Sequence, residues 1–166
     1  MNRRNMLAIS AVAGLGLALL ADGATGQAKV EKSQLVGDWI LVSVNAPNAT
    51  VQNGPNDGFL MFGPNGRFSF ALLSAAVPKF ASGNRNSGTA DENKSAVQGS
   101  IAYFGTYSVN EADGTFTFHI ERCSYPNWNG TDQRRLITSL TPEELKYTNP
   151  SASIGGTAEL VWKRAK

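Results

Sequence analysis

The chain has 166 residues with a formal net charge of +2, and 42% of the residues are hydrophobic against 17% charged. This length suits one globular domain, and the composition excludes an intrinsically disordered chain. Lys and Arg are scattered among acidic residues without a basic stripe, which argues against a nucleic-acid partner.

The single cysteine, Cys123, excludes an internal disulfide. One histidine and one cysteine provide no metal-site spacing, so we expect neither metal nor cofactor. Nothing in the sequence indicates an oligomeric state.

Residues 1–28 have the pattern of an export signal. Arg3 and Arg4 precede an apolar run from Met6 to Leu20, and small residues follow it. The run is shorter than the roughly 20 residues of a spanning helix, so we expect no stable membrane anchor after cleavage. The paired arginines resemble a twin-arginine signal, with an ordinary secretory signal as the alternative. The sequence therefore predicts a periplasmic or secreted bacterial protein whose mature domain spans residues 29–166.

From Leu35 onward, apolar and polar residues alternate in short segments, which is the pattern of β-strands. In chain order the predicted strands are 35–45, 58–62, 67–73, 102–110, 115–121, 134–140, 144–148 and 157–164. The segment Gly63-Pro64-Asn65-Gly66 predicts a tight turn between the second and third strands, because Pro fixes one dihedral and Asn-Gly tolerates positive φ. The first strand should bury Trp39 at the bottom of the fold, with Trp162 and Arg164 closing against it.

One short helix is predicted between the third and fourth strands. Residues from Ser74 to Thr89 are rich in Ser, Ala, Gly and Asn and predict a long loop. Thr89 is a good N-cap, and Asp91 and Glu92 follow in the first turn, which predicts a helix over 90–99. We expect the loop and helix to form a flexible lid over one mouth of the fold.

The short connections favour antiparallel pairing, and strands without covering helices favour closure, because a closed sheet has no exposed edges. The predicted fold class is therefore all-β: an eight-stranded antiparallel barrel with one short helix between strands three and four.

Several segments also resemble a known family. In order along the chain they are "LVGDWILVSV", "FGPNGRFS", "KFASGN", "AYFGTYSV", "PNWNGTDQRR" and "GGTAELVWKR". On these segments the chain resembles the bacterial and fungal lipocalin-like domain family, which implies a small barrel with an internal cavity. Most members are uncharacterised, and a fold does not fix a function. Members commonly carry two neighbouring histidines on the fifth strand, where this chain has Phe118-His119.

The segment from Phe118 to Arg135 concentrates the residues with chemical potential. His119 shares one strand face with Thr115, Thr117 and Glu121, opposite Phe116, Phe118 and Ile120. Because sequential strands usually neighbour each other, we expect His119 to face Tyr107 on one side and Arg135 or Gln133 on the other. Three interpretations remain open: this polar face points into water or forms a satisfied network, it lines a ligand pocket, or it is catalytic.

The leading hypothesis is an exported lipocalin-like barrel that binds a small hydrophobic or aromatic molecule in its cavity. The predicted lining residues are Tyr103, Tyr107, His119, Trp128, Gln133 and Arg135. An alternative is a cofactor-free isomerase, cyclase or lyase for a small carbonyl compound, with His119 as general acid or base and Arg135 and Tyr107 stabilising an oxyanion. A third hypothesis is a structural module with a filled core. Convergence of His119 and Arg135 inside an open cavity favours catalysis, whereas His119 outside the cavity favours passive binding.

Overall fold

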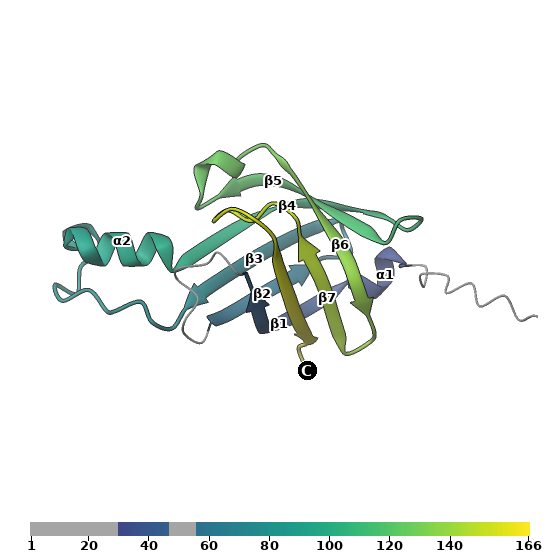
Figure 1. Cartoon of the computed structure of the whole chain (residues 1–166), viewed down its shortest axis with the longest axis horizontal. Coiled ribbons are helices and arrows are strands. Elements are labelled where there is room, and N and C mark those ends of the chain that lie inside the picture. The colour runs from purple at the N-terminus through teal and green to yellow at the C-terminus, as the bar shows by residue number, and fades with distance from the viewer. Residues whose placement is uncertain (1–29, 47–55) are drawn as a thin grey trace, which may run out of the picture.

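The computed structural model describes residues 30–46 and 56–166, in which eight antiparallel strands form one closed barrel (Figure 1). The strands are β1 (Gly37–Asn45), β2 (Asn56–Phe62), β3 (Arg67–Ser74), β4 (Ser100–Asn110), β5 (Thr115–Cys123), β6 (Asp132–Leu140), β7 (Glu144–Asn149) and β8 (Ala158–Arg164). Each strand pairs with the next along the chain, and β8 pairs with β1. The predicted fold class is confirmed. The predicted signal peptide lies outside the described residues.

The helical elements are α1 (Lys32–Leu35), α2 (Ala90–Gln98) and two 3₁₀ turns, η1 (Arg85–Ser87) and η2 (Pro126–Trp128). The helix predicted over 90–99 corresponds to α2. The four-residue α1 and the two 3₁₀ turns were not predicted, because segments this short carry no helical periodicity. No helix in 30–46 or 56–166 is long and apolar enough to cross a membrane.

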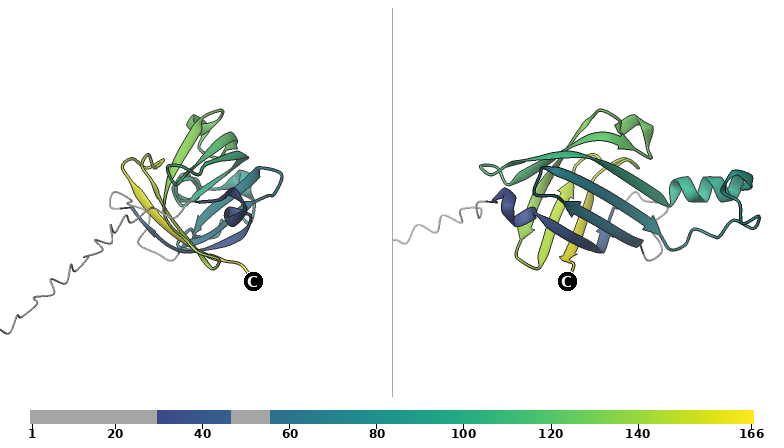
Figure 2. Two further views of the ribbon diagram at one scale, coloured as in Figure 1. Left: turned by 90° about the vertical axis from the view of Figure 1, so that its right-hand side faces the viewer. Right: turned by 180° about the vertical axis from the view of Figure 1, so that it is seen from behind.

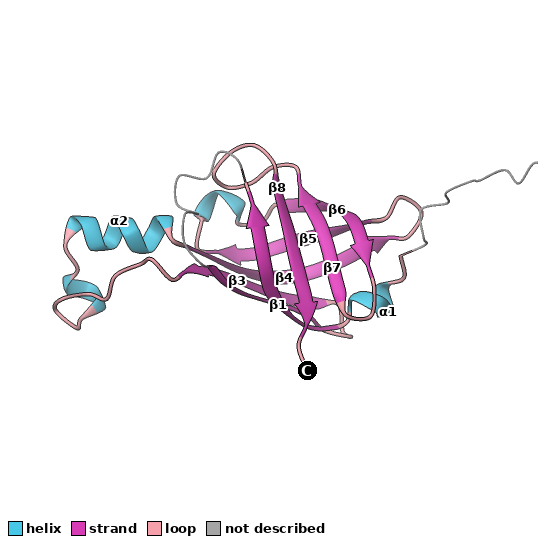
Figure 3. Ribbon diagram, turned by 60° about the horizontal axis from the view of Figure 1, so that its bottom comes forward, coloured by secondary structure: helices cyan, strands magenta, loops and turns pink. Residues whose placement is uncertain are grey.

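The connections between strands differ in length at the two ends of the barrel. At the end near α1, which we call the closed end, strands are joined across residues 63–66, 111–114 and 141–143. At the opposite end, the open end, the connections span 75–99 and 124–131, and β7 joins β8 across 150–157. Figures 2 and 3 show α1 and α2 at these opposite ends.

Helix α2 begins where the sequence predicts but does not cover the barrel. The Thr89 hydroxyl accepts from the Glu92 N–H, and the Glu92 carboxylate accepts from the N–H groups of Thr89 and Ala81, both at 2.8 Å. No residue of α2 is buried, and the helix extends away from the barrel at the open end (Figure 1). The predicted lid is therefore wrong for most of the helix, because α2 has no apolar face to bury against the barrel. Only Val97 and Gln98, in its last turn, border the mouth.

The closed end is sealed by a tryptophan and an arginine. Trp39 is fully buried on β1, and its indole Nε1 donates to the Leu35 carbonyl at 2.8 Å. The Arg164 guanidinium stacks on the Trp39 ring at 4.1 Å. It donates to the carbonyl oxygens of Gln34 and Val36, both at 2.8 Å, and to that of Pro142. The prediction that Trp39 and Arg164 close the barrel is confirmed.

Gly37 is required by this seal. Its φ is +126°, and a Cβ at this position would lie 2.6 Å from Arg164 Nη1. A side chain would thus be strained in its backbone and would displace the guanidinium. The Gly37-x-Trp39 pattern and Arg164 therefore form one structural unit, although they lie at opposite ends of the barrel sequence.

Aromatic rings fill the interior next to this seal. We call Phe62, Phe68, Tyr107, Phe116 and Phe118 the aromatic cluster; each is at most 4% exposed. Ring centroids lie 4.1 Å apart for Phe68 and Phe118, 4.8 Å for Phe62 and Tyr107, and 4.9 Å for Phe116 and Phe118. This half of the barrel therefore has the solid core that the structural-module hypothesis expects.

Candidate ligand-binding site

A cavity of about 290 Å³ occupies the open end of the barrel. Inward-facing positions on β3, β4, β7 and β8 form its wall, and the connections that follow β3, β5 and β7 form its rim. At this level the inward residues include Leu72, Ser74, Ile101, Asn149 and Ala158. These side chains are smaller than the phenylalanines of the aromatic cluster. The same inward alternation therefore fills one half of the barrel and leaves the other half hollow.

Two polar side chains at the rim accept hydrogen bonds from the backbone of the loops. Ser74 and Asn149 are 8% and 7% exposed. The Ser74 hydroxyl accepts from the Ala76 N–H at 3.2 Å, and the Asn149 side-chain oxygen accepts from the Ser151 N–H at 3.1 Å. These bonds fix the start of each loop and shape the mouth of the cavity.

Arg135 lies beneath the floor of the cavity on β6, with only 1% of its surface exposed. Its guanidinium lies over the rings of Phe118 and Trp128, at 5.5 and 5.7 Å from their centroids. Nη1 donates to the Arg134 carbonyl at 2.8 Å. Nε and Nη2 make no hydrogen bond of ordinary geometry with any described residue, although the neutral Tyr103 hydroxyl lies close enough to interact with the guanidinium. The structure thus keeps a buried cation with one edge free, which is uncommon because buried polar groups are normally satisfied.

Two tyrosines connect Arg135 to the cavity. Tyr103 and Tyr147 both line the cavity and are 4% and 1% exposed. Burial raises the pKa of both phenols, that of Tyr147 well above its ordinary value of 10.0, while the charge of Arg135 opposes both rises. The Tyr147 hydroxyl and Trp162 Nε1 lie close to each other, but neither makes a hydrogen bond of ordinary geometry within the described part of the chain. The floor therefore offers protonated phenols and a guanidinium edge in an apolar wall.

The structure brings together only some of the predicted site residues. Tyr103 and Trp128 line the cavity, and Arg135 lies behind them. Tyr107 belongs to the aromatic cluster at the closed end, where its hydroxyl donates to the Gly63 carbonyl at 3.0 Å. Gln133 is half-buried below the rim and donates to the Thr131 hydroxyl at 3.2 Å. Tyr107 and Gln133 are not among the cavity-lining residues.

The predicted position of His119 opposite Tyr107 and Arg135 is wrong. Tyr107 pairs with Phe118, and Arg135 pairs with Phe116, so both face the interior. His119 pairs with Thr106 and Asp132 and lies on the outer face of the barrel. A difference of one residue in register moves a side chain to the other face of the sheet. The apolar alternation of Phe116, Phe118 and Ile120 marks the inward face of β5 and favours His119 on the outer face.

On the outer face, His119 joins two polar neighbours. Its Nδ1 lies 2.7 Å from Asp132 Oδ1, and its Nε2 lies 2.8 Å from Ser108 Oγ. This is the order of a serine–histidine–aspartate relay. However, the side chains of His119 and Asp132 are 40% and 68% exposed, and the hollow beside them is open to solvent. Water screens such a relay and weakens its electrostatic stabilisation of a transition state. The arrangement therefore fits a solvated network across three strands.

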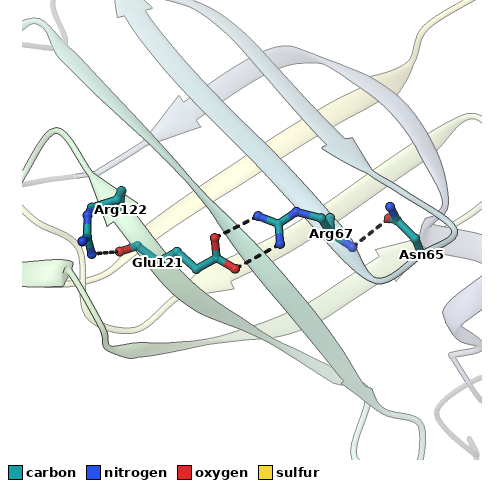
Figure 4. A network of polar contacts seen from close by, with 4 residues as sticks. All are labelled: Asn65, Arg67, Glu121 and Arg122. Atoms are coloured by element: carbon teal, nitrogen blue, oxygen red, sulfur yellow. Dashed lines mark hydrogen bonds and ion pairs between the residues drawn. The ribbon is translucent and has the colours of Figure 1, made fainter.

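A second outer network connects β3 to β5 across β4 (Figure 4). The Arg67 guanidinium donates to both carboxylate oxygens of Glu121, at 2.9 and 3.1 Å, and holds the pKa of that carboxyl below its usual value. Asn65 accepts from the Arg67 N–H, and Arg122 donates to the Glu121 carbonyl. Both side chains of the ion pair are about half exposed, 48% and 47%. The network fastens strands together and does not reach the cavity.

Sequence reasoning missed Tyr147 and Asn149 as site residues. Both lie on β7, whose alternation Leu145, Tyr147, Asn149 runs from apolar core to polar rim. That gradient was visible in the sequence, but the predicted strand of 144–148 ended before Asn149. No group of three His, Cys, Asp or Glu residues that would hold a metal occurs in 30–46 or 56–166.

Comparison with known proteins gave one family and several distant structures. The profile of the lipocalin-like domain matches residues 36–165. No curated protein matches the chain. A redesigned β-barrel is 15% identical, with 81% of this chain and 94% of that chain covered and a TM-score of 0.44. Bovine odorant binding protein is 19% identical, with 84% and 77% covered and a TM-score of 0.40. The amine binding protein of Rhodnius prolixus, in its tryptamine complex, is 10% identical, with 82% and 67% covered and a TM-score of 0.40. At these values no function is transferred from them.

Proposed function

The chain belongs to the lipocalin-like domain family, and from this premise we propose that it binds one small, largely apolar molecule at the open end of its barrel. The observation that carries the proposal is the cavity of about 290 Å³ above a solidly filled closed half. Pockets for small organic ligands begin at about 300 Å³. The ligand is therefore small, of the size of a few fused rings or a medium-length chain.

The wall of the cavity supports an apolar or aromatic ligand. Phe70, Leu72 and Leu160 supply aliphatic and aromatic surface, and Tyr103 and Trp128 add flat rings at 5.6 Å centroid separation. Burying apolar ligand surface against such a wall contributes about 25 cal/mol for each Å² removed from water. The two rim groups, Ser74 and Asn149, accept hydrogen bonds from the loops, so polar contacts to a ligand at the rim are confined to the donors of these two side chains.

Blocking the cavity tests the proposal. Leu72 lines the cavity, whereas its neighbour Leu73 faces outward and is 51% exposed. Leu72→Trp should weaken the binding of N-phenyl-1-naphthylamine, a neutral aromatic probe, by at least about tenfold, because the indole occupies the space of the ligand. Leu73→Trp is the matched control and should bind like the wild type in a fluorescence titration. Equal binding by both variants, or no binding by the wild type, refutes the proposal.

We do not propose the alternative isomerase, cyclase or lyase activity. His119 lies on the outer face of the barrel and Arg135 on the inner face, so the two side chains do not converge on one reacting atom. General acid–base catalysis requires such convergence within hydrogen-bond reach of the substrate.

We further propose that the protein is exported to the periplasm or secreted, with residues 1–28 as the signal. The support is the paired arginines followed by an apolar run of signal-peptide length. A reporter fused after residue 28 should be exported by a bacterial host. The double change Arg3→Lys and Arg4→Lys should stop export if the twin-arginine route is used. Unchanged export of this variant identifies the ordinary secretory route, and a cytoplasmic wild-type fusion refutes export altogether.

A further inference from the structure

Arg135 is a buried cation that the protein itself leaves partly uncompensated. A guanidinium keeps its proton in proteins, so burial does not neutralise it. Buried charges are normally paired with an opposite charge. No Asp or Glu in the described part of the chain forms an ion pair with Arg135, and only Nη1 has a hydrogen-bond acceptor in ordinary geometry. The described residues thus place a neutral phenol, the Tyr103 hydroxyl, beside this charge but supply no anion.

The geometry of the free atoms indicates which group of a ligand would compensate this charge. Nε and Nη2 are the unpartnered nitrogens. Together they form one edge of the guanidinium, from which two N–H bonds point in parallel. A carboxylate offers one oxygen to each N–H and also supplies the opposite charge, which a hydroxyl or a carbonyl does not. Arg135 Cζ lies over the rings of Phe118 and Trp128, and neither ring supplies a hydrogen-bond acceptor of ordinary geometry for this edge.

Arg135 lies directly behind residues that line the cavity, although it is not itself a lining residue. Trp128, which contacts Arg135, lines the cavity. Tyr103 and Tyr147 also line it, and the charge of Arg135 lowers the pKa of both phenols, against the larger rise caused by burial. Both phenols stay protonated at neutral pH, because burial raises the pKa of each. The Tyr147 hydroxyl itself makes no hydrogen bond of ordinary geometry with any described residue and is a further donor for an entering acceptor.

We propose that the ligand is a small apolar carboxylic acid whose carboxylate binds the free edge of Arg135 at the cavity floor, with its apolar part against Tyr103, Trp128 and Leu72. This inference rests on the proposed binding function and adds the chemical class of the ligand. The apolar wall selects the body of the molecule, and the buried cation selects its head group.

Matched acid and amide probes test the inference. In competition with N-phenyl-1-naphthylamine, 2-naphthoate should bind the wild type at least about tenfold more tightly than 2-naphthamide, since the two probes share a shape and differ in charge. Arg135→Met should remove this preference, so that the affinities for 2-naphthoate and 2-naphthamide become similar. Arg135→Lys keeps the charge but loses the fork, so its preference should be intermediate.

The outcomes separate this inference from the binding function. Equal affinities for acid and amide in the wild type, with the neutral probe still displaced, overturn the carboxylate inference and leave cavity binding intact. Such a result would mean that ordered water satisfies the guanidinium. Persistence of the acid preference in Arg135→Met also overturns it. If neither 2-naphthoate, 2-naphthamide nor the neutral probe binds the wild type, both proposals fail. The wild-type ratio requires no variant, so misfolding of a variant does not obscure the result.

Discussion

The closed and open halves of the barrel are built from the same strands but differ in what their inward positions carry. Near the closed end, phenylalanines and Tyr107 meet at centroid distances of 4.1 to 5.8 Å and fill the interior. Near the open end, smaller side chains such as Leu72 and Ala158 leave a cavity of about 290 Å³. The difference teaches that side-chain volume at alternate positions, and not the strand framework, decides where a barrel is a core and where it is a site.

The hydrogen bonding of two arginines, Arg164 at the closed end and Arg135 below the cavity, also differs between the two halves. Arg164 stacks on Trp39 at 4.1 Å and donates to three backbone carbonyls, so it is satisfied by the chain. Arg135 lies over Trp128 at 5.7 Å, more deeply buried, and keeps an edge that makes no hydrogen bond of ordinary geometry with the described residues. A buried arginine that the fold satisfies acts as structure, whereas one that the fold leaves open is suited to a ligand.

The largest expected effect is on the aromatic cluster. Phe118→Ala should lower the free energy of unfolding by about 3–5 kcal/mol, because it removes a fully buried ring and leaves a cavity that its neighbours cannot fill. Urea denaturation measures the loss. Leu72→Ala, which enlarges space that is already open, should cost less than half as much. Similar losses for the two variants would show that the open half is as tightly packed as the closed half.

The second-largest loss of stability is expected from a change in the seal of the closed end. Arg164→Met removes hydrogen bonds from a charged group to three carbonyls, so it should cost about 2–3 kcal/mol of stability. Arg135→Met should cost less than this or increase the melting temperature of the ligand-free protein, because it removes a buried charge that lacks a partner. Thermal unfolding of the two variants without ligand makes the comparison. A larger loss for Arg135→Met would assign that residue a structural role.

A change on the outer face should have a small effect. His119→Ala removes hydrogen bonds to Asp132 and Ser108, whose network is largely solvated. We expect a stability loss of less than about 1 kcal/mol and unchanged affinity for N-phenyl-1-naphthylamine, since the ring does not reach the cavity. Loss of probe binding in a folded His119→Ala protein would contradict the assignment of the site to the interior.

The smallest effect concerns pH. Arg67 holds the pKa of Glu121 below its ordinary value of 4.5, so this pair contributes stability that is fully present above pH 4.5. That contribution is lost as the pH falls through the lowered pKa of the folded state. Arg67→Gln should remove this part of the acid dependence, as measured by denaturation at a series of pH values below 5. Because the pair lies on the outer face, probe binding at neutral pH should not change, and a change would link this network to the cavity.

The fold was predictable because its signals are local. Alternation, the turn at Gly63-Pro64-Asn65-Gly66 and the Thr89 cap each act within a few residues, and all three are confirmed. Trp162 and Arg164 were both expected to close against Trp39. Arg164 stacks on Trp39, whereas the Trp162 ring, in the same buried core, stacks on Tyr147.

The site was less predictable because it depends on register between strands. Tyr103 and Trp128 were correctly expected at the cavity, but His119 was expected opposite Tyr107, and the pairing of Phe118 with Tyr107 places His119 outside. Cross-strand register depends on the apolar faces of both strands together, and the expected pairing, which rested on strand order, was one residue out of register. The unpartnered edge of Arg135 could not be predicted from the sequence either. It arises because no neighbouring strand places a hydrogen-bond acceptor in ordinary geometry beside Nε and Nη2.

The unequal connections at the two ends of the barrel have a consequence for how the protein tolerates change. The tight turns at 63–66, 111–114 and 141–143 adjoin the sealed end, where an insertion would disturb the framework. The longer segments 75–99, 124–131 and 150–157 all surround the mouth, and lengthening a surface loop costs little, about 0.6 kcal/mol for each doubling. Changes to the loops at the mouth should therefore alter which ligand enters at a smaller cost in stability than insertions at the sealed end.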